Sequence, residues 1–191
     1  MASALLIGSG AFSQVEAERS MSVQVAGDSS AYLGLVPNER IKGIRESESG
    51  ELEVALTDPG VNPSAITQFG HFAETEDDYE GFDPRTTEEP ILSGEEFTSG
   101  FLVVNQSTED QIIDLDILHN DPEEPTLVFQ SHDTDGNQIA AATFPDDERH
   151  AVQTTLEVGE AFGVSFVIDT NGADVGDSLA AEIMISSEAA E

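Results

Sequence analysis

The sequence predicts an all-β protein: an antiparallel β-sandwich, jelly-roll-like, with one long acidic insertion loop. Short segments in which polar and apolar residues alternate recur along the chain, and turn-forming residues separate them. This spacing is typical of β-sandwiches. Hydrophobic residues make up 38% of the chain and include ten Phe, whereas disordered acidic chains contain few aromatic residues. We therefore expect a globular domain with an acidic surface.

The alternation predicts a series of strands that begins near residue 20. In chain order they are Ser20–Ala26, Ala31–Val36, Glu51–Leu56, Phe97–Asn105, Gln111–Leu118, Thr126–Ser131, Gln138–Phe144, Val152–Val158, Ala161–Thr170 and Ser178–Ser186. Residues 106–110 and 133–137 each connect two consecutive strands. Asp135-Gly136, in the second connection, is a strong hairpin-turn signal.

The segment Thr57–Glu96 departs from this pattern. It is rich in proline and glycine and contains the acidic run Glu74–Glu80. This composition favours a long surface loop with little regular structure. We therefore divide the chain into a lead-in over residues 1–19, one sandwich domain over residues 20–186 with its insertion at about 57–96, and a flexible tail over residues 187–191.

The charge balance indicates the environment and excludes two classes of partner. Six Lys and Arg stand against 39 Asp and Glu, which gives a formal net charge of −33, and Lys42 is the one lysine. Nucleic acids and anionic membrane surfaces attract basic patches, and we expect none from six cations. Acidic excess with little lysine indicates solubility in molar salt, where the Debye length falls to about 3 Å. We predict a halophilic source; the alternative is an acidic ion-binding protein from ordinary salt.

The N-terminal residues predict secretion or a cell-surface location. Leu5–Ile7 is apolar, and the small residues Gly8–Ala11 follow it, before Phe12. The segment is too short to span a bilayer. It is similar to the second half of a secretory signal peptide, which predicts cleavage near Ala11–Ala17. The alternative is an ordinary first strand or helix.

The residues offer no catalytic motif, so we predict a non-enzyme without a cofactor. The chain has no cysteine, which excludes disulfides and thiolate sites. The four histidines are His71, His119, His132 and His150, and they form no HExxH motif. A zinc site assembled from distant histidines is the alternative.

One turn is a candidate calcium site. Asp133, Asp135 and Asn137 resemble the first half of a calcium loop, which predicts weak Ca²⁺ binding. Gly136 stands fourth and Phe144 twelfth, where an EF-hand has glycine sixth and Glu twelfth, so the segment is not an EF-hand. A tight turn is the alternative explanation.

A second turn is a candidate modification site. Asn105-Gln106-Ser107 is a sequon with an allowed middle residue, whereas Asn62-Pro63-Ser64 is blocked by its proline. In a secreted protein, Asn105 is therefore a candidate for N-glycosylation.

Several segments resemble a known family. They are Gly8–Ser20 followed by Met21–Val25, then Ala31–Leu35, Gly60–Ala65, Phe101–Asn105, Leu156–Glu160 and Val164–Thr170. They resemble the domain-of-unknown-function 1102 family of haloarchaeal secreted proteins. The Ala-Phe-Ser opening is also similar, more distantly, to the camelysin and TasA group of secreted β-sandwich proteins, although Gln14 stands where that pattern has Asp. The resemblance implies a sandwich fold; TasA-like proteins build extracellular fibres, and camelysin is described as a metalloprotease.

Together these observations predict a non-catalytic structural protein of the halophilic cell surface, with itself or other cell-envelope proteins as partners. The strand Ser20–Ala26 is the candidate for donation to a neighbouring subunit, whose groove Met21, Val23 and Val25 would fill. The alternative for this strand is that it closes its own sandwich. The alternatives for the protein are a secreted metal-dependent peptidase and a monomeric surface binding module.

Overall fold

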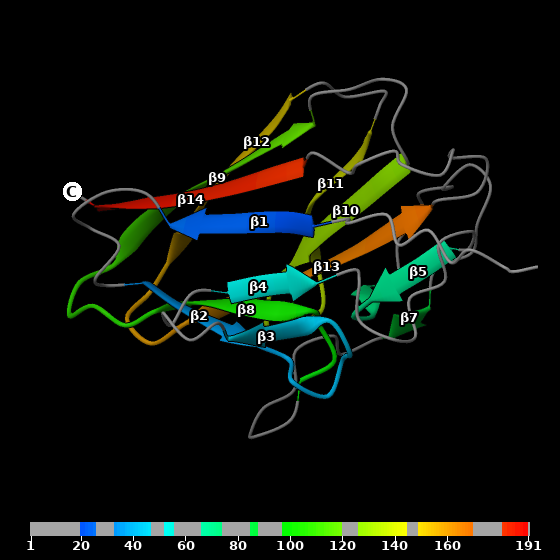
Figure 1. Ribbon diagram of the computed structural model, residues 1–191. Helices are drawn as coiled ribbons and strands as arrows, with labels where there is room; N and C mark the ends of the chain where they lie inside the picture. Colours follow the sequence, from blue (N-terminus) through cyan, green and yellow to red (C-terminus); the bar gives the residue numbers. More distant parts are fainter. Residues whose placement is uncertain are drawn as a thin grey trace, which may run out of the picture.

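The computed structural model confirms the all-β fold class and the sandwich (Figure 1). It describes residues 20–25, 33–46, 52–55, 66–73, 85–87, 97–119, 126–144, 149–169 and 181–190. Within these ranges the chain forms strands and no helix. The strands make two six-stranded sheets and a separate two-stranded pair.

Sheet A contains the first and the last strand of the part of the chain that the structure describes. Its spatial order is β12 (Arg149–Leu156), β9 (Gln111–His119), β14 (Ala181–Ala189), β1 (Ser20–Val25), β4 (Leu52–Ala55) and β3 (Ile44–Glu46). Neighbouring strands are antiparallel except β1 and β14, which run parallel. The alternation did not predict β3, because three residues are too few to show a period of two.

Sheet B packs against sheet A (Figure 1). Its spatial order is β11 (Gln138–Phe144), β10 (Thr126–His132), β13 (Ala161–Asp169), β8 (Phe101–Asn105) and β2 (Leu33–Pro37), and β5 (Ile66–Phe69) also pairs with β13. β5 and β8 pair with different halves of β13, with Phe69 opposite Phe166 and Phe101 opposite Val164. The rings of Phe69 and Phe166 stack with centroids 4.8 Å apart.

The core lies between the two sheets. Alternate residues of each strand point into it, as the period-two pattern predicts. On β9, Ile113, Leu115 and Ile117 are buried, whereas Asp114 and Asp116 between them are half-buried. The core cluster also contains large side chains from both sheets, among them Phe101, Val103, Phe129, Phe162, Phe166, Ile183 and Ile185. Each buried Phe or Ile of this kind contributes roughly 1.5–3 kcal/mol of hydrophobic stabilisation.

The outer face of sheet B is covered as well. β13 is buried at every position from Phe162 to Ile168, because residues 70–73 lie over its outer face. Phe72 packs there against Val128 and Val167 in a second, small apolar cluster. Phe72 belongs to β6 (Phe72–Ala73), which pairs in parallel with β7 (Thr86–Thr87).

Two expectations about loops need correction. The segment Thr57–Glu96 was expected to have little regular structure, yet its described residues include β5, β6 and β7, and β5 extends sheet B. The tail was expected to be flexible from Ser187, yet β14 runs to Ala189, and the Ala190 N–H donates to the Asp110 carbonyl at 2.9 Å. Pairing of β14 with β9 over its whole length explains this order. The lead-in 1–19 and the acidic run at 74–80 lie outside the described residues.

Candidate functional site

The candidate strand for donation, β1, lies inside sheet A. On one side Ser22 to Val25 pair in parallel with Glu182 to Ile185. On the other side Ser20 to Ser22 pair with Ala55 to Glu53. In a single chain β1 therefore closes its own sandwich, and both of its neighbours are far away in the sequence. Met21, Val23 and Val25 lie on this strand, at positions opposite Val54, Ile183 and Ile185.

Asn105, the candidate for glycosylation, holds a turn through its side chain. Its side chain is fully buried. Its Nδ2 donates to the carbonyls of Glu109 and Leu156 at 3.0 Å and of Glu157 at 3.1 Å, and its Oδ1 accepts from the Ser107 N–H and hydroxyl. A glycan on Nδ2 would break these bonds in the folded domain. Glycosylation at Asn105 stays a prediction, and it requires that Nδ2 give up its bonds to these carbonyls.

The candidate calcium turn is held by its own hydrogen bonds. Asp133 Oδ1 accepts from the backbone N–H of Asp135 at 2.9 Å and of Asn137 at 2.8 Å. Asn137 turns its amide nitrogen, a donor, toward both Asp133 oxygens, at 3.3 and 3.0 Å. Asp133 and Asn137 are thus together, but as acceptor and donor, which is the arrangement of a tight turn. Among the described residues no group of three or more metal-binding side chains is present.

The fold divides the four histidines between the two sheets and a connection, although two of them, His119 and His150, lie on the neighbouring paired strands β9 and β12. His119 and His150 lie on β9 and β12 of sheet A, whereas His132 lies on β10 of sheet B and His71 lies between β5 and β6. The zinc peptidase stays an untested alternative.

His132 is the most unusual of the four. It is fully buried on the outer face of sheet B, and neither ring nitrogen has a hydrogen-bond partner among the described residues. Burial lowers the pKa of His132 to about 4, against the opposing effect of the Asp133 carboxylate. The ring leaves no room at Gly163: a Cβ there would collide with His132 Nε2 and with the Ser99 hydroxyl.

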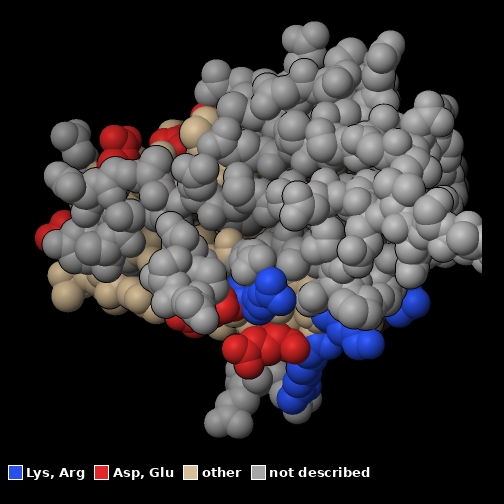
Figure 2. Space-filling view, viewed as in Figure 1, with Lys and Arg blue, Asp and Glu red and all other residues tan. Residues whose placement is uncertain are grey.

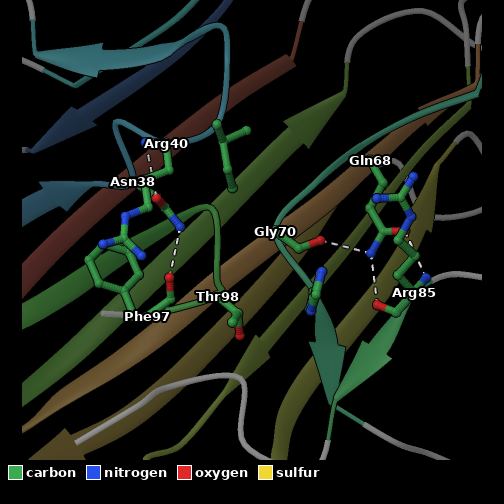
Figure 3. A pocket seen from close by; sticks show the side chains of 9 residues that line it. Asn38, Arg40, Gln68, Gly70, Arg85, Phe97 and Thr98 are labelled. Atoms are coloured by element: carbon green, nitrogen blue, oxygen red, sulfur yellow. Dashed lines mark hydrogen bonds between the residues drawn. The ribbon is translucent and has the colours of Figure 1, made fainter. Parts of the chain in front are cut away.

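A polar hollow lies where the insertion meets the connection between β2 and β3 (Figure 3). Its volume is about 260 Å³, and its walls include Asn38, Arg40, Gln68, His71, Arg85 and Phe97. These residues come from four separate stretches of the chain. The two arginines are exposed, whereas Asn38 is buried and Gln68 is half-buried.

Asn38 fixes one wall of this hollow. Its Nδ2 donates to the carbonyls of Phe97 and Ser99, both at 2.9 Å, and its own N–H donates to the Gly100 carbonyl at 3.0 Å. Its Oδ1 accepts from the Arg40 N–H at 3.2 Å. The buried side-chain amide thus ties the backbone of Arg40 to the segment that leads into β8.

Gln68 fixes the opposite wall in a similar way. Its Oε1 accepts from the Arg85 N–H at 2.8 Å, and its Nε2 donates to the carbonyls of Arg85 at 2.9 Å and of Gly70 at 2.7 Å. Gly70 has φ +83°, and a Cβ there would collide with the Gly100 nitrogen and the Ser165 hydroxyl. Only glycine allows this close approach of the backbone. The approach brings Gln68, whose side chain binds Arg85, against the sandwich.

The arrangement of the cations was not predicted. Arg40, Lys42 and Arg45 lie within six consecutive positions, so half of the six cations of the chain are in the β2–β3 region. The fold adds Arg85 to the same hollow as Arg40, and Figure 2 shows Lys and Arg side chains gathered on this side of the molecule. The three cations at positions 40–45 were the feature of the sequence that could have indicated this cationic region. The place of Arg85 beside the same hollow depends on Gln68, whose side chain binds the N–H and the carbonyl of Arg85.

A second hollow, of about 400 Å³, adjoins the first and shares Asn38, Arg40 and Phe97 with it. Glu39 and Glu46 also line this second hollow. The described residues that line the first hollow include neither Asp nor Glu, although 39 of the 191 residues of the chain are acidic. Among the described residues that line the first hollow, Arg40 and Arg85 are thus the arginines, and the acidic side chains lie in the second hollow.

Comparison with protein-family models, with curated proteins and with solved structures gave no match. Among the described residues, no helix has the length and apolar character needed to span a membrane.

Proposed function

We propose that the protein is a non-catalytic structural subunit of a halophilic cell surface and that β1 joins it to a neighbouring copy by strand exchange. The observation that carries this proposal is the pairing of β1. Its two neighbours in sheet A are β14, the last strand, and β4, which follows β2 and β3. The β1 of a second copy can form the same hydrogen bonds, so the exchange replaces one set of pairs with an identical set.

The charge of the chain makes such an assembly depend on salt. At a net charge of −33, copies repel one another in dilute buffer, whereas molar salt shortens the Debye length to about 3 Å and screens the repulsion. This behaviour suits a secreted protein of a hypersaline environment. Lowering salt to about 0.1 M extends the Debye length to roughly 10 Å and should lower the melting temperature. A melting temperature that does not change over this range would contradict the halophilic assignment.

A cross-linking experiment tests the exchange, because the chain has no cysteine of its own. Ser22 and Glu182 are opposite one another on β1 and β14, so the variant S22C/E182C places a disulfide across this pair. Oxidation under assembling conditions in molar salt should give a ladder of covalent oligomers if β1 is donated. Monomers with an internal disulfide under the same conditions would contradict donation.

The matched control is the variant D114C/Q153C. Asp114 and Gln153 are opposite one another on β9 and β12, and Gln153 Nε2 donates to Asp114 Oδ1 at 2.8 Å. The donation of β1 does not involve this pair, so its disulfide should form within one chain whatever the assembly state. A ladder in the control would show random oxidation and not exchange.

A further inference from the structure

We propose that the insertion carries a salt-dependent cover for the outer face of sheet B, and that this cover detaches when salt is diluted, before the sandwich unfolds. The cover consists of residues 70–73 and of β7, which pairs with Phe72 and Ala73. The inference is independent of the proposed assembly through β1, because the cover packs on sheet B, whereas β1 belongs to sheet A.

The cover is attached to sheet B by side chains of the sheet. The Ala73 N–H donates to Gln130 Oε1 at 2.6 Å, and the His71 carbonyl accepts from the Ser165 hydroxyl at 2.8 Å. Breaking these two bonds leaves the backbone pairs between β10 and β13 intact. Detachment also uncovers Phe72, which is fully buried. The cover is thus a candidate for local opening, which in proteins occurs in cooperative units of lower stability than the whole fold.

The strands of the cover are short in comparison with those of the sandwich. β6 and β7 pair over two residues, whereas β9 pairs with β14 over nine residues and with β12 over eight. The free energy of opening rises with the number of backbone pairs and buried side chains that opening disrupts. Opening of the cover therefore costs less free energy than disruption of a large sheet.

The charge of the insertion supplies the force that opens the cover. Residues 74–96 include ten Asp and Glu against one cation, Arg85, which gives this stretch a net charge of −9 within a chain of net charge −33. This stretch and the rest of the protein repel each other. The Debye length is about 3 Å in molar salt and about 10 Å at 0.1 M. Dilution therefore favours the state in which residues 70–73, which directly precede this stretch, are detached.

Amide hydrogen exchange of the full chain gives the readout. The His71 N–H donates to the Thr98 carbonyl at 2.9 Å, and the Ala73 N–H donates to Gln130, so the closed cover protects both amides. The amide of Phe129, on β10 between β11 and β13, reports on the sandwich. Each rate is divided by the rate of the same residue in a peptide at the same salt, which removes the direct effect of salt on exchange.

The wild-type salt series is the first test. Between molar salt and about 0.1 M, the protection of His71 and Ala73 should fall at least about tenfold more than the protection of Phe129. Equal losses of protection at the three amides would overturn the proposal, because the cover and the sandwich would then open together.

Matched charge variants separate the repulsion of the insertion from that of the whole protein. Two variants each replace three glutamates by glutamine, one set in the insertion and one set exposed on the sandwich: E74Q/E76Q/E80Q and E109Q/E157Q/E188Q. The first variant should reduce the loss of protection at Ala73 by at least about twofold, and the second should reduce it clearly less. Ser165, under the cover, and Ala161, where β13 begins after the turn of Glu157, are four residues apart, about 13 Å, which exceeds the Debye length at 0.1 M. A control that acts as strongly as the first variant would contradict the proposal.

A third variant tests whether the cover is a separate unit. Phe72→Ala removes the buried ring that packs against Val128 and Val167, and it should expose the His71 and Ala73 amides to exchange even in molar salt while Phe129 stays protected. If Phe129 loses protection to the same degree, the cover does not open separately and the proposal is wrong. If this variant does not fold, the wild-type salt series decides, because it compares the same three amides.

Discussion

The two faces of sheet B are buried by different chemistry. The inner face presents Phe129, Phe162 and Phe166, each at most 2% exposed, to the core between the sheets. The outer face presents Gln130 and Ser165, both fully buried, to residues 70–73 of the insertion. The inner face therefore depends on apolar packing, whereas the outer face combines a small apolar cluster around Phe72 with hydrogen bonds that require one register.

The outer face shows what such a polar layer requires. Gln130 Oε1 accepts from the Ala73 N–H at 2.6 Å, and the Ser165 hydroxyl donates to the His71 carbonyl at 2.8 Å. His132 lies on the same face, and its ring has no hydrogen-bond partner among the described residues. The inner face tolerates small shifts because dispersion and hydrophobic forces have little directionality, whereas the outer face does not.

The largest expected effect is on the inner face. Phe166→Ala removes a fully buried ring that stacks on Phe69, and it should lower the free energy of unfolding by about 3–5 kcal/mol. Denaturant titration in molar salt measures this loss. Val158→Ala, at a position that is 53% exposed, is the control and should stay within about 0.5 kcal/mol of wild type. A loss for Phe166→Ala below about 1 kcal/mol would show that the stacked pair does not lie in the core.

The inner face was predictable from the sequence, and the outer face was not. Alternation on strands such as β8 and β9 marks the inward residues directly, since one face of each strand is apolar. Gln130 and Ser165 are polar, so the same pattern indicates that they face solvent. Only the course of residues 70–73 shows that they are buried, and those residues carry no repeat from which their position could be inferred.

The candidate site was unpredictable for a related reason. Arg40 and Arg85 line the same hollow, and the side chains of Asn38 and Gln68 bind their backbone N–H groups. No local sequence pattern identifies these side-chain-to-backbone bonds. The turn at Asp133 was predictable because its hydrogen bonds are local in sequence. Asn105 looked like a surface sequon, and its burial comes from contacts with Leu156 and Glu157, about fifty residues further along the chain.

The second largest effect is a pH dependence of the outer face. Burial lowers the pKa of His132 to about 4 from an ordinary 6.5, so the unfolded chain binds a proton more readily than the folded one between these values. The wild-type domain should therefore lose about 3 kcal/mol of stability from this residue as the pH falls from 6.5 to 4. Above pH 6.5 His132 is neutral in both states, and its contribution is constant.

The variant His132→Leu isolates this contribution from that of the many carboxylates. The difference in unfolding free energy between wild type and variant should be flat above pH 7 and should shift in favour of the variant by about 3 kcal/mol toward pH 4. Denaturant titrations at a series of pH values in molar salt measure it. A difference that does not change with pH would mean that the His132 ring is solvated in the folded protein.

A third, smaller effect tests how tightly the outer face is packed. Gly163→Ala adds a Cβ that collides with His132 Nε2 and the Ser99 hydroxyl, and such overpacking costs about 1–3 kcal/mol. In a His132→Ala background the collision with the ring is removed, so the same substitution should cost less. The double-mutant cycle gives the coupling energy between the two positions. A coupling energy near zero would contradict the contact between His132 and Gly163.

The smallest expected effect concerns a single hydrogen bond between the insertion and sheet B. Ser165→Ala removes the donor to the His71 carbonyl and should lower the free energy of unfolding by about 1 kcal/mol. Because His71 also lines the hollow, hydrogen exchange of the His71 N–H, which donates to the Thr98 carbonyl at 2.9 Å, should become faster. Ser186→Ala on β14, which changes the same side chain in sheet A, is the control and should leave that exchange rate unchanged. Equal exchange rates in the two variants would mean that residues 70–73 are held by Gln130 and the Phe72 cluster without help from Ser165, and the outer face would then depend on apolar packing more than on its hydrogen bonds.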